Sequence, residues 1–130
     1  MILGLGTDII GIERFEKTLE RAGEVFLQHV FTIAEVKAAP TGSKQRCAYF
    51  AARWAAKEAL SKALGTGIGQ KCSWRDIEIR NNADGKPELF LIGTAADTAA
   101  AMGIECLHLS LSHEMLYACA TVIAEGGAGK

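Results

Sequence analysis

Two carboxylates stand in surroundings that are otherwise apolar or small, and such positions are where an acid can do chemistry. Asp8 lies in the apolar run M-I-L-G-L-G-T-D-I-I, and Glu58 lies in the alanine-rich stretch A-A-K-E-A-L-S-K. A bare buried charge is very costly, so each acid needs a partner. For Asp8 the partner is either a Lys or Arg of the alanine-rich stretch or a hard metal ion such as Mg²⁺, which one or two carboxylates usually hold.

Basic side chains surround Glu58. Lys57 precedes it, Lys62 follows it at i+4, and Arg53 lies more than one helical turn before it. A Glu58–Lys62 pair on a helix would contribute only about 0.2–0.5 kcal/mol. The alternative is a mixed site, in which the acid holds a metal ion and the bases bind phosphate. The residues alone leave both interpretations open.

His113 is a third candidate, in the segment H-E-M that we predict to be a loop. A loop histidine can act as a general base or as a hydrogen-bond donor. We interpret His108, on the preceding predicted strand, as structural. A G-x-S-x-G nucleophile elbow is absent, and the pattern Gly4-x-Gly6 continues to Ile9 where a dinucleotide fingerprint needs a glycine.

We predict that a strand over residues 2–10 positions Asp8. A period of two places Asp8 on the same face as Gly4 and Gly6. That face could admit a metal ion, a substrate phosphate or the helix that carries Glu58, and we interpret the glycines as clearance around a metal ligand. The opposite face is apolar, and we expect it to be the core face: Leu3, Leu5, Thr7 and Ile9.

The other elements follow from hydrophobic periodicity and turn residues. Helices are predicted over residues 12–22, from Ile33 to just before Pro40, and over residues 45–64, the second one started by a Thr32/Glu35 capping box. Strands are predicted at 74–80, 88–92, 106–112 and 116–124, with a helix that begins at Thr94 and ends at Gly103. This order predicts an α+β fold with a mainly antiparallel sheet packed on a long central helix.

Charge on the helix at 12–22 is sorted onto two flanks. The basic flank carries Arg14, Lys17 and Arg21, and the acidic flank carries Glu13, Glu16 and Glu20. A solvated face with i,i+4 ion pairs is one interpretation, and a binding face is the other.

Composition narrows the function classes. The chain has 130 residues and a net charge of −1. It therefore lacks the overall positive charge that would attract nucleic acid or an anionic membrane. We predict one domain over residues 1–125 and a flexible tail at 126–130. The apolar runs are far shorter than the ~20 residues of a membrane span. The four cysteines form no C-x-x-C pair, and we interpret them as reduced thiols of a cytoplasmic protein.

Five stretches, in this order, resemble the holo-(acyl-carrier-protein) synthase family, the small bacterial phosphopantetheinyl transferases. They are G-L-G-T-D-I-I, F-A-A-R-W-A-A-K-E-A-L-S-K-A-L-G-T-G, D-I-E-I, D-G-K-P and H-L-S-L-S-H-E. The resemblance implies the phosphopantetheinyl transferase fold and a homotrimer with active sites between subunits. It also implies Mg²⁺-dependent transfer of 4′-phosphopantetheine from coenzyme A to a serine of apo-acyl carrier protein, with release of adenosine 3′,5′-bisphosphate. A non-catalytic module of the same fold that binds coenzyme A or a nucleotide is the alternative.

The resemblance also assigns residues. It implies that Asp8 and Glu58 are metal ligands, and that they act in catalysis with His113, which lies near the pyrophosphate. It implies that Arg14 and Arg21 grip the acidic carrier protein. Glu58, a metal-bound water and His113 are all candidates for the base that takes the serine proton. The residues implied to contact coenzyme A are Arg53, Ser61, Lys62, Gly65 and His113.

Overall fold

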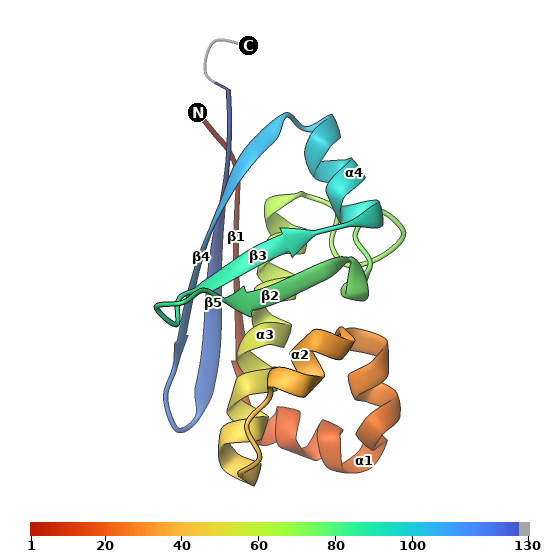
Figure 1. Cartoon of the computed structure of the whole chain (residues 1–130), viewed down its shortest axis with the longest axis vertical. Coiled ribbons are helices and arrows are strands. Elements are labelled where there is room, and N and C mark those ends of the chain that lie inside the picture. The colour runs from red at the N-terminus through yellow and green to blue at the C-terminus, as the bar shows by residue number, and fades with distance from the viewer. Residues whose placement is uncertain (128–130) are drawn as a thin grey trace.

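The computed structural model describes residues 1–127. It has the α+β fold that the sequence predicts. In chain order (Figure 1) its elements are β1 (Ile2–Gly11), α1 (Ile12–Val30), α2 (Ile33–Ala38), α3 (Ser43–Ala63), the 3-10 turn η1 (Trp74–Asp76), β2 (Ile77–Asn81), β3 (Pro87–Leu91), α4 (Gly93–Ala101), β4 (Ile104–His113) and β5 (Tyr117–Gly126).

The strands form two antiparallel sheets where the sequence suggested one. The long strands make a three-stranded sheet in the order β1-β5-β4, and β2 pairs with β3 in a separate hairpin. Figure 1 shows the three long strands side by side along the molecule, with α3 next to them and the short hairpin crossing in front. Antiparallel pairing is therefore confirmed, and the division into two sheets is new.

Helix α3 packs against β1 at unusually close range. A Cβ atom on Gly6 would collide with the carbonyl oxygen of Ala59, and one on Gly4 would collide with that of Ala63. Only glycine allows this approach of a strand to a helix backbone. The glycines thus make room for the helix, and our interpretation of them as clearance around a metal ligand was wrong. Of the three occupants considered for that face, the helix is the one observed.

The predicted core face of β1 was also wrong. The glycine-bearing face packs on α3, and no element within residues 1–127 covers the opposite face, which we call the outer face of the sheet. On it Leu5 is 64% exposed and Ile9 is 66% exposed. The face of β1 that is buried is the one whose backbone lies close to α3. The alternation of apolar residues along the strand gives no information about that contact.

The predicted break after the first helix and the predicted start of the second are both present. Gly23, predicted to end the first helix, has a non-helical φ of 56°, and α1 consists of two helical segments joined by a kink at this residue. A glycine adopts this left-handed conformation without the Cβ penalty, so it bends the chain there. The capping box at the start of α2 is confirmed in both bonds: Glu35 N donates to the Thr32 hydroxyl, and Thr32 N donates to Glu35 Oε1.

The region around α4 departs from its prediction. Residues 74–76 form a 3-10 turn instead of the start of a strand. Thr94, expected to cap its own helix together with Asp97, donates its N–H and its hydroxyl to Asp76 Oδ2, at 2.8 and 2.6 Å. A carboxylate from the turn therefore satisfies one of the free N–H groups in the first turn of α4, which local sequence could not reveal.

The two ends of the described chain meet. The N–H of Gly126, which closes β5, donates to the carbonyl of Met1 at 2.9 Å. The predicted tail at 126–130 therefore begins inside a strand, and its residues 128–130 lie outside the described residues. None of the helices within residues 1–127 is long and apolar enough to cross a membrane.

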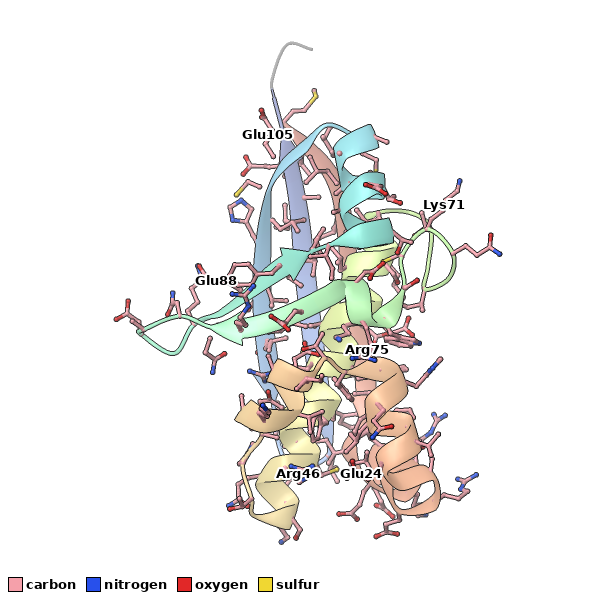
Figure 2. All side chains as sticks on the ribbon, turned by 45° about the vertical axis from the view of Figure 1, so that its right-hand side comes forward. Glu24, Arg46, Lys71, Arg75, Glu88 and Glu105 are labelled. Carbon is pink, nitrogen blue, oxygen red and sulfur yellow. The ribbon has the colours of Figure 1, made fainter. Side chains whose placement is uncertain are left out.

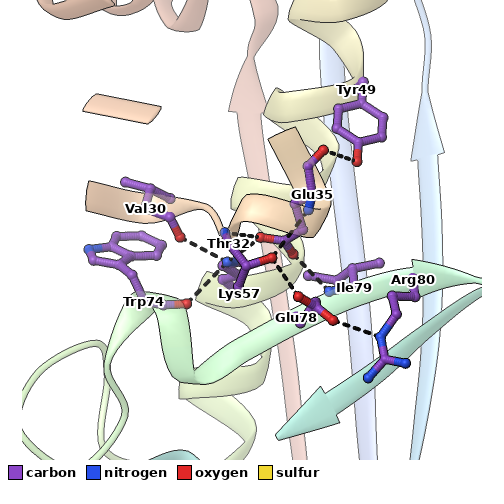
Figure 3. A network of polar contacts seen from close by, with 9 residues as sticks. All are labelled: Val30, Thr32, Glu35, Tyr49, Lys57, Trp74, Glu78, Ile79 and Arg80. Atoms are coloured by element: carbon purple, nitrogen blue, oxygen red, sulfur yellow. Dashed lines mark hydrogen bonds and ion pairs between the residues drawn. The ribbon is translucent and has the colours of Figure 1, made fainter. Parts of the chain in front are cut away.

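A buried ion pair joins α2, α3 and the hairpin (Figure 3). Lys57 is fully buried, and its ammonium group donates to the carbonyls of Val30 and Trp74 and to Glu35 Oε1, at 2.8, 3.1 and 2.7 Å. The other oxygen of Glu35 accepts from Ile79 N at 2.7 Å. All three ammonium protons have an acceptor, so this pair is a closed structural network.

Candidate functional site

The first candidate site lies where β1 passes α3. Lys62 Nζ is 3.1 Å from Asp8 Oδ1 and also donates to the carbonyl of Thr7 at 3.1 Å. The salt bridge considered for Asp8 is therefore present, and Lys62 pairs with Asp8 and not with Glu58. The Asp8 side chain is only 12% exposed, whereas that of Lys62 is 51% exposed. The pair is thus buried at the acid and open to solvent at the base.

One oxygen of Asp8 is left over. Oδ2 is buried and accepts no hydrogen bond from the part of the chain that the structure describes. An unpaired buried carboxylate oxygen is costly, so it points to a partner that binds from outside. Hard oxygen ligands of this kind suit Mg²⁺.

Glu58 is the second carboxylate at this place. Burial raises the pKa of Glu58, the nearby charge of Asp8 raises it further, and Lys62 opposes the rise. Two carboxylates that repel each other this way are stabilised by a shared cation. The donor atoms present at Asp8 and Glu58 therefore fit a divalent metal ion.

A second group of predicted residues gathers around Arg53. Its Nη2 donates to Asn81 Oδ1 at 3.1 Å, and its guanidinium carbon lies 3.8 Å from the centre of the Tyr49 ring. Its Nε is buried without a partner among residues 1–127. Burial lowers the pKa of Arg53, and the neighbouring Tyr49 and Glu35 counter that effect. The side chain is rigidly held, with one donor to spare.

His113 is the last residue of β4 and not part of a loop, so that expectation was wrong. It is exposed and lines a cavity of about 380 Å³ together with Arg53 and Asn81. It also borders a larger cavity of about 820 Å³ between the first turns of α1 and α3. A cationic side chain and a histidine thus face one space, which suits an anionic ligand.

Asp8 lines a different cavity. This one has a volume of about 280 Å³ and is shared with Arg14, Phe15 and Trp54. Within one chain the structure therefore brings Asp8, Glu58 and Lys62 together, and Arg53 with His113, but Asp8 lines a different cavity from the one that Arg53 and His113 line.

The remaining predicted residues differ in accessibility. Ser61 is fully buried, and its hydroxyl donates to the carbonyl of Glu58 at 2.7 Å. Gly65 is exposed, follows the end of α3 and has φ 78°. Arg14 and Arg21 are both exposed on α1. Gly65 and the two arginines are open to a ligand or partner, whereas the Ser61 side chain is already occupied.

Two residues of the Arg53 cavity were missed by the sequence analysis. Tyr49 lies four residues before Arg53 on α3, so i,i+4 spacing could have indicated their contact. Asn81 comes from the end of β2, far away in the chain, and nothing in the local sequence indicates that it meets Arg53.

Comparison with known proteins places these features in a family. Residues 4–121 match the model of the 4′-phosphopantetheinyl transferase superfamily. The holo-(acyl-carrier-protein) synthase of Edwardsiella ictaluri is 50% identical over 125 residues, which span 96% of this chain and 98% of that protein.

Solved structures agree. The crystal structure of the holo-(acyl-carrier-protein) synthase from Neisseria meningitidis superposes with a TM-score of 0.88 at 38% identity, covering 96% of this chain and 99% of that one. The enzyme from Bacillus anthracis, crystallised in complex with coenzyme A (3′,5′-ADP), has a TM-score of 0.82 at 39% identity and covers 98% of this chain and 99% of that one.

Proposed function

We propose that this chain, which belongs to the 4′-phosphopantetheinyl transferase superfamily, is a holo-(acyl-carrier-protein) synthase. It transfers the 4′-phosphopantetheine arm of coenzyme A to a serine of apo-acyl carrier protein and releases adenosine 3′,5′-bisphosphate. The observation that carries the proposal is the group of Asp8, Glu58 and Lys62, set in a chain that matches such synthases over nearly its whole length.

Asp8 and Glu58 would hold the Mg²⁺ ion. The unpaired buried oxygen of Asp8 and the raised pKa of Glu58 support this assignment. When bound, the ion supplies positive charge that neutralises the reacting pyrophosphate of coenzyme A.

The chain's own cations act on the same substrate. The reaction is the attack of a serine hydroxyl on a phosphorus of the pyrophosphate, so the protein mainly positions two substrates and balances charge. Lys62 presents an ammonium group beside the carboxylates, and the guanidinium of Arg53 lines a cavity with His113, where it can bind a phosphate. Glu58 and His113 are both able to accept the proton that the serine loses.

Near the end of α3, two exposed residues are positioned to contact coenzyme A. Lys62 and Gly65 are accessible, and the left-handed Gly65 lets the chain turn without a side chain in the way. Because the Ser61 hydroxyl is bonded to the carbonyl of Glu58, we assign Ser61 the role of holding that turn of α3.

The active protein is a homotrimer in this proposal. The outer face of the β1-β5-β4 sheet exposes Leu5 and Ile9 and has no helix over it within residues 1–127, which is a surface suited to another copy. The separation of Asp8 from the Arg53–His113 cavity also supports an active site completed between subunits. Sedimentation should report a trimer for the natural chain and smaller species for the Leu5→Glu, Ile9→Glu double variant.

The location proposed for the enzyme is the cytoplasm. The cysteines Cys47, Cys72, Cys106 and Cys119 are all free, which suits a reducing compartment.

Mass spectrometry of the carrier protein tests the function. Apo-acyl carrier protein incubated with the enzyme, coenzyme A and Mg²⁺ should gain the mass of one phosphopantetheine group, and a carrier with its acceptor serine replaced by alanine should not. Coenzyme A binding without any mass gain would favour the non-catalytic module and contradict the proposal.

A further inference from the structure

A second set of metal-ligand side chains lies on the outer face of the three-stranded sheet, away from Asp8 and Glu58. The thiol of Cys106, the imidazole of His108 and the carboxylate of Glu125 place one ligand atom each within 4.8 Å of one another. Cys106 and Glu125 are register partners on β4 and β5, and His108 is two residues along β4, so all three point to the same side. Figure 2 shows their neighbour Glu105 at the end of the molecule where β4 begins.

We propose that Cys106, His108 and Glu125 form a site for a borderline divalent transition metal such as Zn²⁺, with one ligand from each of the three side chains. The site is independent of the transferase chemistry proposed above, because it shares no residue with that site.

The distances match such an ion. His108 Nε2 lies 3.6 Å from the sulfur of Cys106. In a tetrahedral zinc site, bonds of about 2.3 Å to sulfur and about 2.0 Å to nitrogen put these atoms about 3.5 Å apart. The same Nε2 is 2.7 Å from Glu125 Oε1. A bound ion would open that contact to about 3.3 Å, a shift that the half-exposed side chains of His108 and Glu125 can make.

The placement and the chemistry of the three ligands also fit. Two neighbouring strands of one sheet carry the ligands, which gives the site a rigid base. Thiolate, imidazole and carboxylate together favour Zn²⁺ or Co²⁺ over Mg²⁺, which prefers oxygen alone.

Cobalt titration of the full-length assembled protein tests the site. Co²⁺ bound to a thiolate gives a near-ultraviolet charge-transfer band, and Co²⁺ bound to Asp8 and Glu58 cannot. We expect the band to saturate at one equivalent per chain, to persist in excess Mg²⁺ and to disappear when Zn²⁺ is added.

Variants of the ligands show whether these side chains hold the ion. Cys106→Ser should abolish the band, and His108→Ala should weaken cobalt binding by more than about tenfold. Cys119→Ser is the control, because Cys119 lies on the same outer face but pairs with Ser112, four residues along β4 from His108. Absence of the band in the natural chain, its survival in Cys106→Ser, or its loss in Cys119→Ser would each overturn the proposal.

Discussion

Helix α3 carries two lysines that each pair with an acid from another element, and the two pairs are built in opposite ways. Lys57 is fully buried and bonded to three acceptors, and both oxygens of its partner Glu35 are also bonded. Lys62 is half-exposed, and its partner Asp8 keeps one buried oxygen unpaired. The first pair is complete within the chain, and the second is not.

This difference separates structure from function. A closed pair has no free hydrogen-bonding group for a ligand. Removing either partner leaves a buried charge without compensation, so it should damage the fold. An open pair with a spare buried oxygen can receive a cation or exchange its lysine contact for a phosphate. Sequence spacing treats the two lysines alike, and only the surroundings distinguish them.

The largest expected effect comes from breaking the closed pair. Lys57→Ala leaves the charge of Glu35 buried and uncompensated, so we expect a loss of about 3–5 kcal/mol in the free energy of unfolding. Denaturant unfolding measures it. Adding Glu35→Gln to Lys57→Met should recover part of the loss, because no unpaired charge then remains. A stable Lys57→Ala protein would show that the network is not structural.

Removing either carboxylate of the open site should lower the transferase activity. Asp8→Ala and Glu58→Ala should each lower the transfer rate by about 10²–10³-fold, because each removes charge stabilisation at the reacting group. The unfolding midpoint should stay close to that of the natural chain. Asp97→Ala, an exposed carboxylate on α4, is the matched control. Full activity in both Asp8 and Glu58 variants would rule out the metal assignment.

The close approach of β1 to α3 links the two regions. Gly6→Ala should cost about 1–3 kcal/mol of stability, since its Cβ would meet the Ala59 carbonyl and push β1, with Asp8, away from α3. Gly69→Ala is the control, because no atom lies within 4 Å of its added Cβ. Equal stability of the two variants in thermal unfolding would contradict the packing described here.

Removing the lysine of the open pair should hardly affect the fold. Lys62→Ala should change stability by no more than about 1 kcal/mol, because the ammonium is half in solvent. The KM for coenzyme A should rise, since a phosphate loses its cation. A stability loss as large as that of Lys57→Ala would erase the distinction between the pairs.

The smallest effect concerns the rim of the Asp8 cavity. Arg14→Glu should raise the KM for the acidic carrier protein by roughly fivefold, the equivalent of about 1 kcal/mol, with the KM for coenzyme A unchanged. The natural enzyme's carrier KM should also rise with salt. Steady-state kinetics with each substrate varied in turn would show whether the arginine serves the carrier or the coenzyme.

Local signals predicted the elements well and their environments less well. The Thr32 capping box, the hairpins and the long helix reflect short-range rules, and those elements fold as expected. The faces of β1 were assigned the wrong way round. Period-two reasoning ranks faces by side-chain hydrophobicity, whereas burial here is set by two glycines that let a helix backbone approach.

The candidate site was predicted residue by residue, but its arrangement was not. Asp8 and Glu58 stood out because acids are rare in apolar surroundings, and the structure places both beside Lys62. The link between Arg53 and Asn81 depends on the hairpin folding back over α3, which no spacing encodes. The homotrimer, the magnesium requirement and the cytoplasmic location stay predictions.

Direct metal binding tests the central claim, that the open carboxylate pair is a cation site. Mn²⁺, a spectroscopic stand-in for Mg²⁺, can be titrated into the protein in the presence of coenzyme A and followed by electron paramagnetic resonance. We expect one tight equivalent per chain that is lost in Asp8→Asn and in Glu58→Gln and kept in Asp97→Asn. Undiminished binding in both Asp8→Asn and Glu58→Gln would contradict the account.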